Sequence, residues 1–416
     1  MRKAPLFRVP RGDGLDGMSS SVSYPDPVRQ ERTSLPRWVA VGVLTLSTFL
    51  VVTSEMLPVG MLTPMADGLG LSPGATGLSL TVTGLVSAVT APVVPRLLGN
   101  LDRRRVLAAA VVVLAAGNGL TTIAVDFGLL MVSRVVLGIG MGAVWGMASA
   151  VAIRLVAPRD SALAVSFVVS GVAAASVLGV PLGTFVGNAF GWRAAFCALT
   201  VIALLLVPAL LLTLPTLRRP VVVAETGAGQ RRSLFRPAVV TGLAVVVLLV
   251  TAHFAAYTYV RPALEELPRM PADAIALLLL LYGVFGLIGN FVAGAGAGRR
   301  PRLTVLLLAA GIAVALGVLA LFGASALAAG IAIALWGMAY GGLSVGAQLW
   351  MTAIAPDRVE HVTGLYVGVF TGSIALGAFA GGLVVEGAGV LPLLWSTAAL
   401  AVVSLLVGSA GRPIAA

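Results

Sequence analysis

Charged residues are scarce in this chain, and so are cysteine and histidine. Asp, Glu, Lys and Arg make up 10% of its 416 residues, against about 25% in soluble domains, so water is not its main solvent. Its only cysteine, Cys197, excludes an internal disulfide, and the apolar run around it predicts a small buried core residue. The two histidines have no metal-ligand spacing, and no Gly-Lys-Ser/Thr loop is present to bind ATP. We therefore expect no metal, no cofactor and no enzyme activity.

Most of the chain consists of long apolar runs. Apolar residues make up 59% of the chain and the mean hydropathy is +1.04. Because a helix needs about 20 apolar residues to cross a bilayer, these runs predict an all-α membrane protein with twelve transmembrane helices. The predicted spans are 38–64, 74–95, 105–125, 128–155, 161–187, 194–214, 237–261, 273–297, 303–323, 326–354, 361–385 and 390–410.

The net charge of +11 is distributed unevenly between the predicted loops. If the N-terminus is cytoplasmic, the outer loops hold only Arg193, Arg261 and Arg269 among the basic residues. This asymmetry follows the positive-inside rule, so the charge indicates topology and not nucleic-acid binding. Arginine is abundant and Lys3 is the only lysine, a bias typical of GC-rich bacterial genomes. We expect a multi-pass protein of the bacterial plasma (inner) membrane with both termini in the cytoplasm.

The two halves of the chain repeat each other at a fixed separation. After a shift of 198 residues, four prolines coincide with prolines: Pro64, Pro73, Pro158 and Pro215 with Pro262, Pro271, Pro356 and Pro413. A repeat of this size in an apolar chain is typical of transporters built from two similar bundles around one site. We predict four segments: a disordered cytoplasmic tail over 1–37, with Met18 as an alternative start, six-helix bundles over 38–214 and 237–410, and a cytoplasmic linker over 215–236.

Five stretches carry a family resemblance. They are Ser54-Glu55-Met56-Leu57-Pro58, Leu101-Asp102-Arg103-Arg104-Arg105, the run from Arg134 to Gly140, Gly179-Val180-Pro181-Leu182-Gly183, and the run from His253 to Tyr259. With twelve spans and a 6+6 repeat, the chain resembles the major facilitator superfamily. Within it the chain resembles the drug–proton antiporters, in particular bacterial exporters of sugars, purine nucleosides and chloramphenicol. It departs from the family pattern at Gly99, which lies three and not four residues before Asp102, and at Val180, where the span-5 motif has proline directly after glycine.

The resemblance suggests roles for a loop and for several small residues. Asp102 with Arg103, Arg104 and Arg105 suits a cytoplasmic gating latch, because a carboxylate can pair or cap a helix in one state and release in another. The alternative is a solvated determinant of topology. Small residues let helices approach closely and slide, and a proline inside a span removes a backbone hydrogen bond. The candidates for helix packing are Gly138, Gly179, Pro181, Gly183, Gly377 and Gly381.

Three ionisable residues, Glu55, Arg134 and His253, lie within the predicted hydrocarbon region, away from the ends of their spans, where they are costly and therefore candidates for function. Glu55 and His253 occupy equivalent positions in the two halves. A carboxyl group in an apolar cavity can exchange protons near neutral pH, which makes Glu55 a candidate proton carrier. Arg134 and His253 are further candidates for proton coupling, the former by the resemblance. The alternatives are an ion pair between Glu55 and Arg134, an arginine that reaches the membrane surface, and a hydrogen-bonded core histidine.

An aromatic stripe predicts the lining of a central cavity. Trp336, Tyr340, Leu343, Ala347 and Trp350 recur at helical spacing in span 10. Such a wall suits an apolar or ring-bearing solute, although packing and interface anchoring are alternatives. The full set of cavity candidates is Trp145, Tyr257, Asn290, Trp336, Tyr340 and Gln348.

These features together predict a proton-coupled secondary transporter, acting as a monomer, that exports a small organic molecule by alternating access. The expected partners are a small-molecule substrate, protons and the lipid bilayer. Two alternatives stay open: facilitated or proton-symport movement of a sugar or nucleoside, and a membrane sensor or scaffold that transports nothing.

Overall fold

The computed structural model describes residues 33–98, 101–217, 236–356 and 359–410. Most of the predicted tail and linker lies outside the described residues. The elements, with η1 a 3₁₀ turn and η2 a π-helical turn, are α1 (Leu35–Leu69), α2 (Pro73–Leu97), α3 (Arg103–Thr122), α4 (Phe127–Trp145), α5 (Ala148–Leu155), η1 (Pro158–Asp160), α6 (Ser161–Ala174), η2 (Ala175–Gly179), α7 (Val180–Phe190), α8 (Trp192–Thr213), α9 (Pro237–Thr258), α10 (Val260–Glu266), α11 (Ala272–Ala297), α12 (Pro301–Phe322), α13 (Ala326–Gly341), α14 (Leu343–Ile354), α15 (Val359–Ala388) and α16 (Val390–Ala410).

Twelve candidate membrane spans are present in the described part of the chain, and several are longer or more broken than predicted. Span 1 is one helix, α1, of 35 residues. Span 4 divides into α4 and α5 around Gly146, and span 10 divides into α13 and α14 at Gly342. Span 5 contains the π-helical turn η2 immediately before Pro181. Proline cannot donate its own backbone hydrogen bond, and the π turn accommodates the irregularity there.

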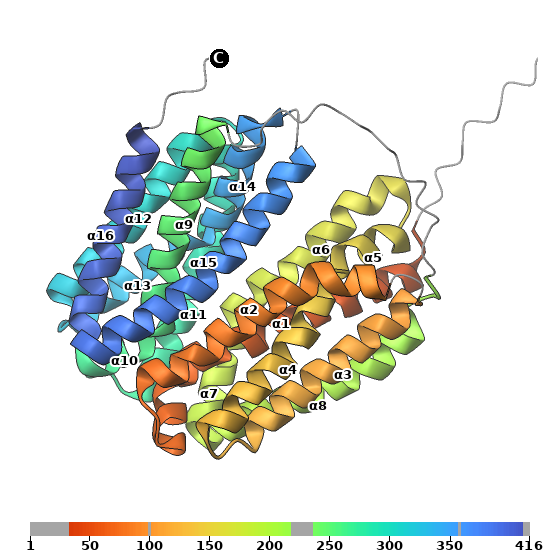
Figure 1. The fold of residues 1–416 in the computed structure, drawn as a ribbon, viewed down its shortest axis with the longest axis horizontal. Coiled ribbons are helices and arrows are strands. Elements are labelled where there is room, and N and C mark those ends of the chain that lie inside the picture. Colours follow the sequence, from red (N-terminus) through yellow and green to blue (C-terminus); the bar gives the residue numbers. More distant parts are fainter. Residues whose placement is uncertain (1–32, 99–100, 218–235, 357–358, 411–416) are drawn as a thin grey trace, which may run out of the picture. The chain divides into compact units, whose positions relative to one another are not determined.

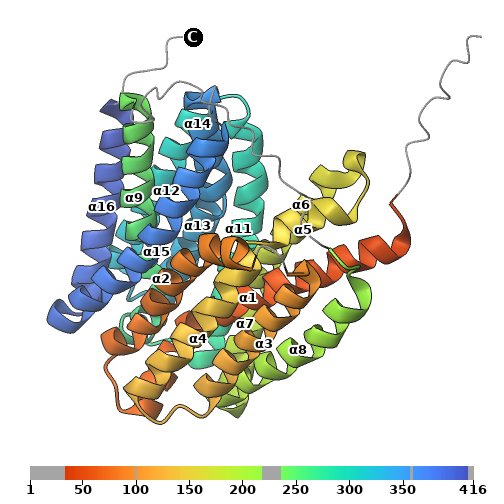
Figure 2. The same cartoon turned by 45° about the vertical axis from the view of Figure 1, so that its right-hand side comes forward.

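The spans form two bundles, α1–α8 and α9–α16, which lie side by side in Figures 1 and 2. The repeat appears in their packing. A side chain at Gly179 or Gly183 would collide with Thr53 or Leu57 of α1. A side chain at Gly377 or Gly381 would meet Thr251 or Ala255 of α9, the residues 198 positions after Thr53 and Leu57. Both glycine pairs therefore let one helix of each half approach the first helix of that half.

Helix α4 packs tightly between two neighbours because of its glycines. A Cβ atom at Gly138 would lie 2.8 Å from the carbonyl oxygen of Thr83 in α2. One at Gly140 would lie 2.6 Å from the backbone nitrogen of Leu114 in α3. Helix α4 is thus held against backbone on both sides.

The bundles meet along few elements. Helix α2 packs against α15, α7 and η2 pack against α11, and α1 contacts α10. At Gly283 of α11, a Cβ atom would lie 2.6 Å from Cα of Val177 in η2. The backbones of the two bundles can therefore approach closely there because the residue at the contact is small.

The predicted burial of Cys197 is wrong. Cys197, expected in the core, is exposed on α8. In a membrane protein the outer surface is as apolar as the core, so an apolar neighbourhood does not distinguish the two.

Candidate functional site

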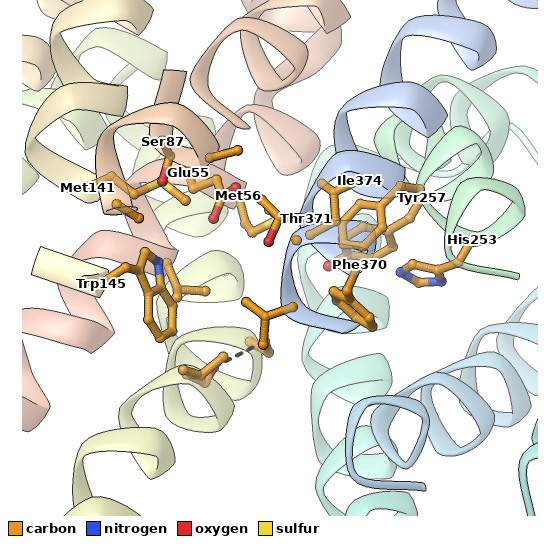
Figure 3. Close-up of a pocket in the computed structure, with 18 of the residues that line it drawn as sticks. Glu55, Met56, Ser87, Met141, Trp145, His253, Tyr257, Phe370, Thr371 and Ile374 are labelled. Carbon is orange, nitrogen blue, oxygen red and sulfur yellow. Dashed lines mark hydrogen bonds between the residues drawn. The ribbon is translucent and has the colours of Figure 1, made fainter. Parts of the chain in front are cut away.

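A cavity of about 600 Å³ lies between the two bundles. One wall comes from α1, α2, α4 and the α6–η2–α7 segment, and the other comes from α9, α11, α13 and α15. Figure 3 shows Glu55, Ser87 and Trp145 on the first wall, facing His253 and Phe370 on the second. Most of the lining is apolar, so the few polar groups determine what chemistry the cavity offers.

Glu55 is the carboxylate on this cavity wall. It lies in the middle of α1, it is 7% exposed, and its side chain points into the cavity. Within the described residues it has no ion-pair partner. A carboxyl group in such a place can hold a proton or offer an oxygen pair to a solute.

Arg134 lies within the first bundle and not on the cavity wall. It is fully buried on α4, and its guanidinium group stands over the ring of Phe196, 5.0 Å from the ring centre. None of its guanidinium nitrogens has a hydrogen-bond partner in the described part of the chain. The structure therefore does not join Arg134 to Glu55, and the cation–π contact with Phe196 is the interaction that it shows.

His253 belongs to an aromatic cluster on the second wall. Its ring stacks on Tyr340 with centres 3.4 Å apart and planes 5° apart. Its Nδ1 accepts a hydrogen bond of 3.0 Å from Nε1 of Trp336, and its Nε2 lies 3.5 Å from the hydroxyl of Tyr282. His253 and Glu55, which are equivalent in the repeat, therefore line one cavity from opposite bundles.

The other candidates divide into two groups. Trp145, Tyr257 and Tyr340 line the cavity. Trp336, Asn290 and Gln348 do not: Trp336 is buried behind His253, and Gln348 is exposed on α14. Tyr282 and Ser87, which sequence reasoning missed, also line the cavity, and their isolated positions in apolar runs gave no signal.

Polar contacts join the two bundles beside the last third of α1, where α10 packs against it. Arg261 of α10 is 4% exposed and donates to the carbonyl oxygen of Gly60 and, over 3.1 Å, to Oδ1 of Asn188 in α7. Arg261 also pairs with Glu265 at 2.8 Å, and Glu265 accepts a hydrogen bond from Thr63 of α1. We call these five residues the clasp, because they join the two bundles. Arg261, expected in an outer loop, is instead buried between helices.

Two further hydrogen bonds join the bundles at the same end. The backbone nitrogen of Gly74, at the start of α2, donates to Oε1 of Glu386 in α15 over 2.9 Å. The side-chain amide of Asn188 also donates to the carbonyl oxygen of Ala272 at the start of α11, over 2.9 Å. Each contact runs from one bundle to the other.

The predicted gating loop is ordered by Asp102. Its carboxylate caps α3 by accepting from the backbone nitrogen of Arg104 over 3.1 Å and accepts from the backbone nitrogen of Leu217 over 2.9 Å. Arg103 contacts the sulfur of Met147, and Arg105 is exposed. In this conformation Asp102 therefore ties α3 to the chain that follows α8.

This chain is similar to known proteins over most of its length. The family profile of the Major Facilitator Superfamily matches residues 44–378. The purine ribonucleoside efflux pump NepI of Shigella sonnei (strain Ss046) is 32% identical over 373 residues, which cover 89% of this chain and 94% of that protein. NepI of Escherichia coli (strain K12) is also 32% identical, with the same coverage.

Two solved structures have the same fold at low sequence identity. A bacterial homologue of the human lysosomal transporter Spinster, in an inward-facing and unoccupied conformation, is 15% identical with a TM-score of 0.74, covering 92% of this chain and all of that one. The nucleoside transporter NupG is 13% identical with a TM-score of 0.72, covering 91% of this chain and all of that one. With twelve spans in two repeated bundles around one cavity, this chain belongs to the major facilitator superfamily of membrane transporters.

Proposed function

We propose that this transporter exports a purine nucleoside or a similar small organic molecule in exchange for protons, with Glu55 as the proton carrier. The observation that carries the proposal is the position of Glu55: a carboxylate with no ion-pair partner among the described residues, on a mostly apolar cavity wall between the bundles. Antiport requires one group whose protonation competes with substrate, and a lone cavity carboxylate meets that requirement. The nucleoside class comes from the efflux pumps that the chain resembles over most of its length.

The proposal includes the orientation and state of the protein. The distribution of basic residues supports cytoplasmic termini in a bacterial inner membrane, which places the clasp at the outer end. The clasp then supports an inward-open state, in which the cavity is closed to the outside. We further propose that the protein acts as a monomer, because each chain supplies both bundles.

Transport by purified protein in liposomes tests the proposal. With an acidic interior, an antiporter accumulates radiolabelled adenosine as protons leave, by up to about tenfold per pH unit at one proton per substrate. Glu55→Gln should abolish this accumulation but still exchange labelled for unlabelled adenosine, because exchange needs no proton step. Asp67→Asn, an exposed acid on the same helix, is the matched control and should accumulate normally.

The other outcomes separate the alternatives. Accumulation that persists in Glu55→Gln would remove Glu55 from the mechanism. Accumulation only with an acidic exterior would indicate symport, and equilibration that ignores the gradient would indicate facilitated diffusion. A protein that neither moves nor binds any solute would favour the sensor or scaffold.

A further inference from the structure

Four rings on the second cavity wall lie nearly parallel. His253 and Tyr257 of α9 stack with centres 5.2 Å apart and planes 19° apart. Tyr257 stacks on Tyr282 of α11 at 4.9 Å and 28°, and His253 stacks on Tyr340 of α13 at 3.4 Å and 5°. All four contribute to the cavity lining. Three helices therefore present a common ring orientation to one space.

Trp336 holds this arrangement from behind. Its plane is nearly perpendicular to the rings of His253, Tyr257 and Tyr282, at 74°, 89° and 85°. It is buried at 1% exposure and contacts the rings edge to face, the geometry that the aromatic quadrupole favours. Trp336 therefore fixes the rings without lining the cavity.

The hydrogen bond from Trp336 also fixes the protonation of His253. An indole N–H can only donate, so Nδ1 of His253 must be an acceptor and cannot carry a proton. In this conformation the imidazole is therefore neutral, with its hydrogen on Nε2, which faces the hydroxyl oxygen of Tyr282. When Tyr282 accepts from Nε2, its own hydrogen is free to point elsewhere. The direction of the whole chain of hydrogen bonds is set by Trp336.

We infer that the cavity-facing side of the ring cluster formed by His253, Tyr257, Tyr282 and Tyr340, which we call the slot, binds one planar heteroaromatic ring of the substrate. In this slot the Tyr282 hydroxyl is the hydrogen-bond donor and Trp336 is the positioning residue. The inference rests on the proposed function and deepens it, because it names the part of the substrate that this cavity wall binds. A purine has a π face to stack and ring nitrogens that accept a hydrogen bond, whereas a ribose has no π face. The second bundle therefore selects the base, and His253 serves as a fixed neutral group and not as a proton carrier in this state.

Direct binding to full-length protein in nanodiscs tests the slot, with adenosine, adenine and ribose as probes. In the wild type, adenine should compete with labelled adenosine and ribose should not. Because base–aromatic stacking contributes a factor of about 5 to 150 in affinity, Tyr340→Leu and Tyr257→Leu should each weaken adenosine and adenine binding by that factor. Tyr282→Phe, which removes one hydroxyl, should weaken it about fivefold. Trp395→Leu removes a half-exposed ring of α16 outside the cavity lining and is the matched control.

Nitrogen-15 NMR of histidine-labelled protein tests the role of Trp336. The chain has two histidines, so a His361→Gln background leaves one signal pair, which should report the neutral Nε2–H tautomer. Trp336→Phe keeps a ring but removes the donor, and should give a tautomer mixture together with weaker adenine binding. Folding of each variant is checked by thermal unfolding, and competition in the wild type needs no variant.

The outcomes of these experiments test the slot proposal and the export proposal separately. Unchanged affinity for adenosine and adenine in a folded Tyr340→Leu protein, or ribose competing as well as adenine, would overturn the slot and leave export standing. Adenine binding without any adenosine transport would uphold the slot and refute the export proposal. A wild type that binds neither adenosine nor adenine would refute both. A protonated or Nδ1–H imidazole in the wild type would overturn the role of Trp336.

Discussion

The clasp predicts how strongly one arginine biases the transporter toward the state in which the clasp is closed. Two hydrogen bonds of Arg261 cross between the bundles, to Gly60 and to Asn188, whereas its pair with Glu265 stays within α10. A hydrogen bond to a charged group contributes about 1.5–3 kcal/mol, so the two crossing bonds favour the closed clasp by about 3–6 kcal/mol. Because about 1.4 kcal/mol corresponds to a factor of ten, Arg261→Ala should lower the closed-to-open ratio at least about a hundredfold.

Distances between spin labels on the two bundles measure this ratio. Val125, between α3 and α4, and Ala324, between α12 and α13, are exposed in loops near the clasp end. Labels at Val125→Cys and Ala324→Cys, in a Cys197→Ser background, should show one short distance in the parent protein. Arg261→Ala should add a longer distance as a major population.

Arg193→Ala is the matched control for this prediction. Arg193 is also a basic residue at this end, but it donates to Ala124 and stacks over Trp192, all within the first bundle. Its removal should lower stability without changing the distance distribution. An unchanged distribution in Arg261→Ala, or the same shift in both variants, would refute the reasoning that the crossing bonds hold the bundles together.

Two smaller predictions concern the first bundle. Gly140→Ala should lower the melting temperature because its Cβ atom would overlap backbone of Leu114, a cost of about 1–3 kcal/mol. Gly317→Ala, on α12 with no atom near its Cβ position, should leave it unchanged or raise it, and equal effects would contradict the packing argument. Asp102→Ala should speed amide hydrogen exchange at Arg104 and Leu217 about 5- to 30-fold, from the loss of about 1–2 kcal/mol of capping. Asp126→Ala, which removes the equivalent cap of α4, should leave exchange at both positions as it was.

The spans were predictable because a bilayer imposes length and hydropathy on every helix that crosses it. Packing within that apolar material was less predictable. Nothing in the sequence distinguishes the exposed apolar surface around Cys197 from the core. Trp336 and Tyr340 share a stripe in sequence, but α13 turns Tyr340 toward the cavity and buries Trp336 behind it. The division depends on neighbours from α9 and α11, which periodicity cannot show.

The clasp illustrates a signal that was present but ambiguous. Arg261 and Glu265 are four residues apart, the spacing of an ion pair on a helix. An apolar-run criterion ends the span near Arg261 and assigns the charges to a loop. The structure extends the chain as α10, so the pair points between helices and reaches Asn188 and Gly60. Charge at the end of a predicted span can therefore belong to an interface.

The divergence of the two halves explains why one site carries both a free carboxylate and a ring slot. Glu55 and His253 are equivalent in the repeat, but their surroundings are not. At the positions equivalent to Tyr282, Trp336 and Tyr340, the first half has Gly84, Gly138 and Gly142. Gly138 and Gly142 pack directly against the backbone of α2, which leaves no volume there for rings. The first bundle thus keeps Glu55 without an aromatic shell that would fix its protonation, whereas the second encloses His253 in rings that do. If proton exchange requires a group that is free to change its charge, and ring recognition requires a surface that does not move, then each half can meet one requirement because the other half meets the second.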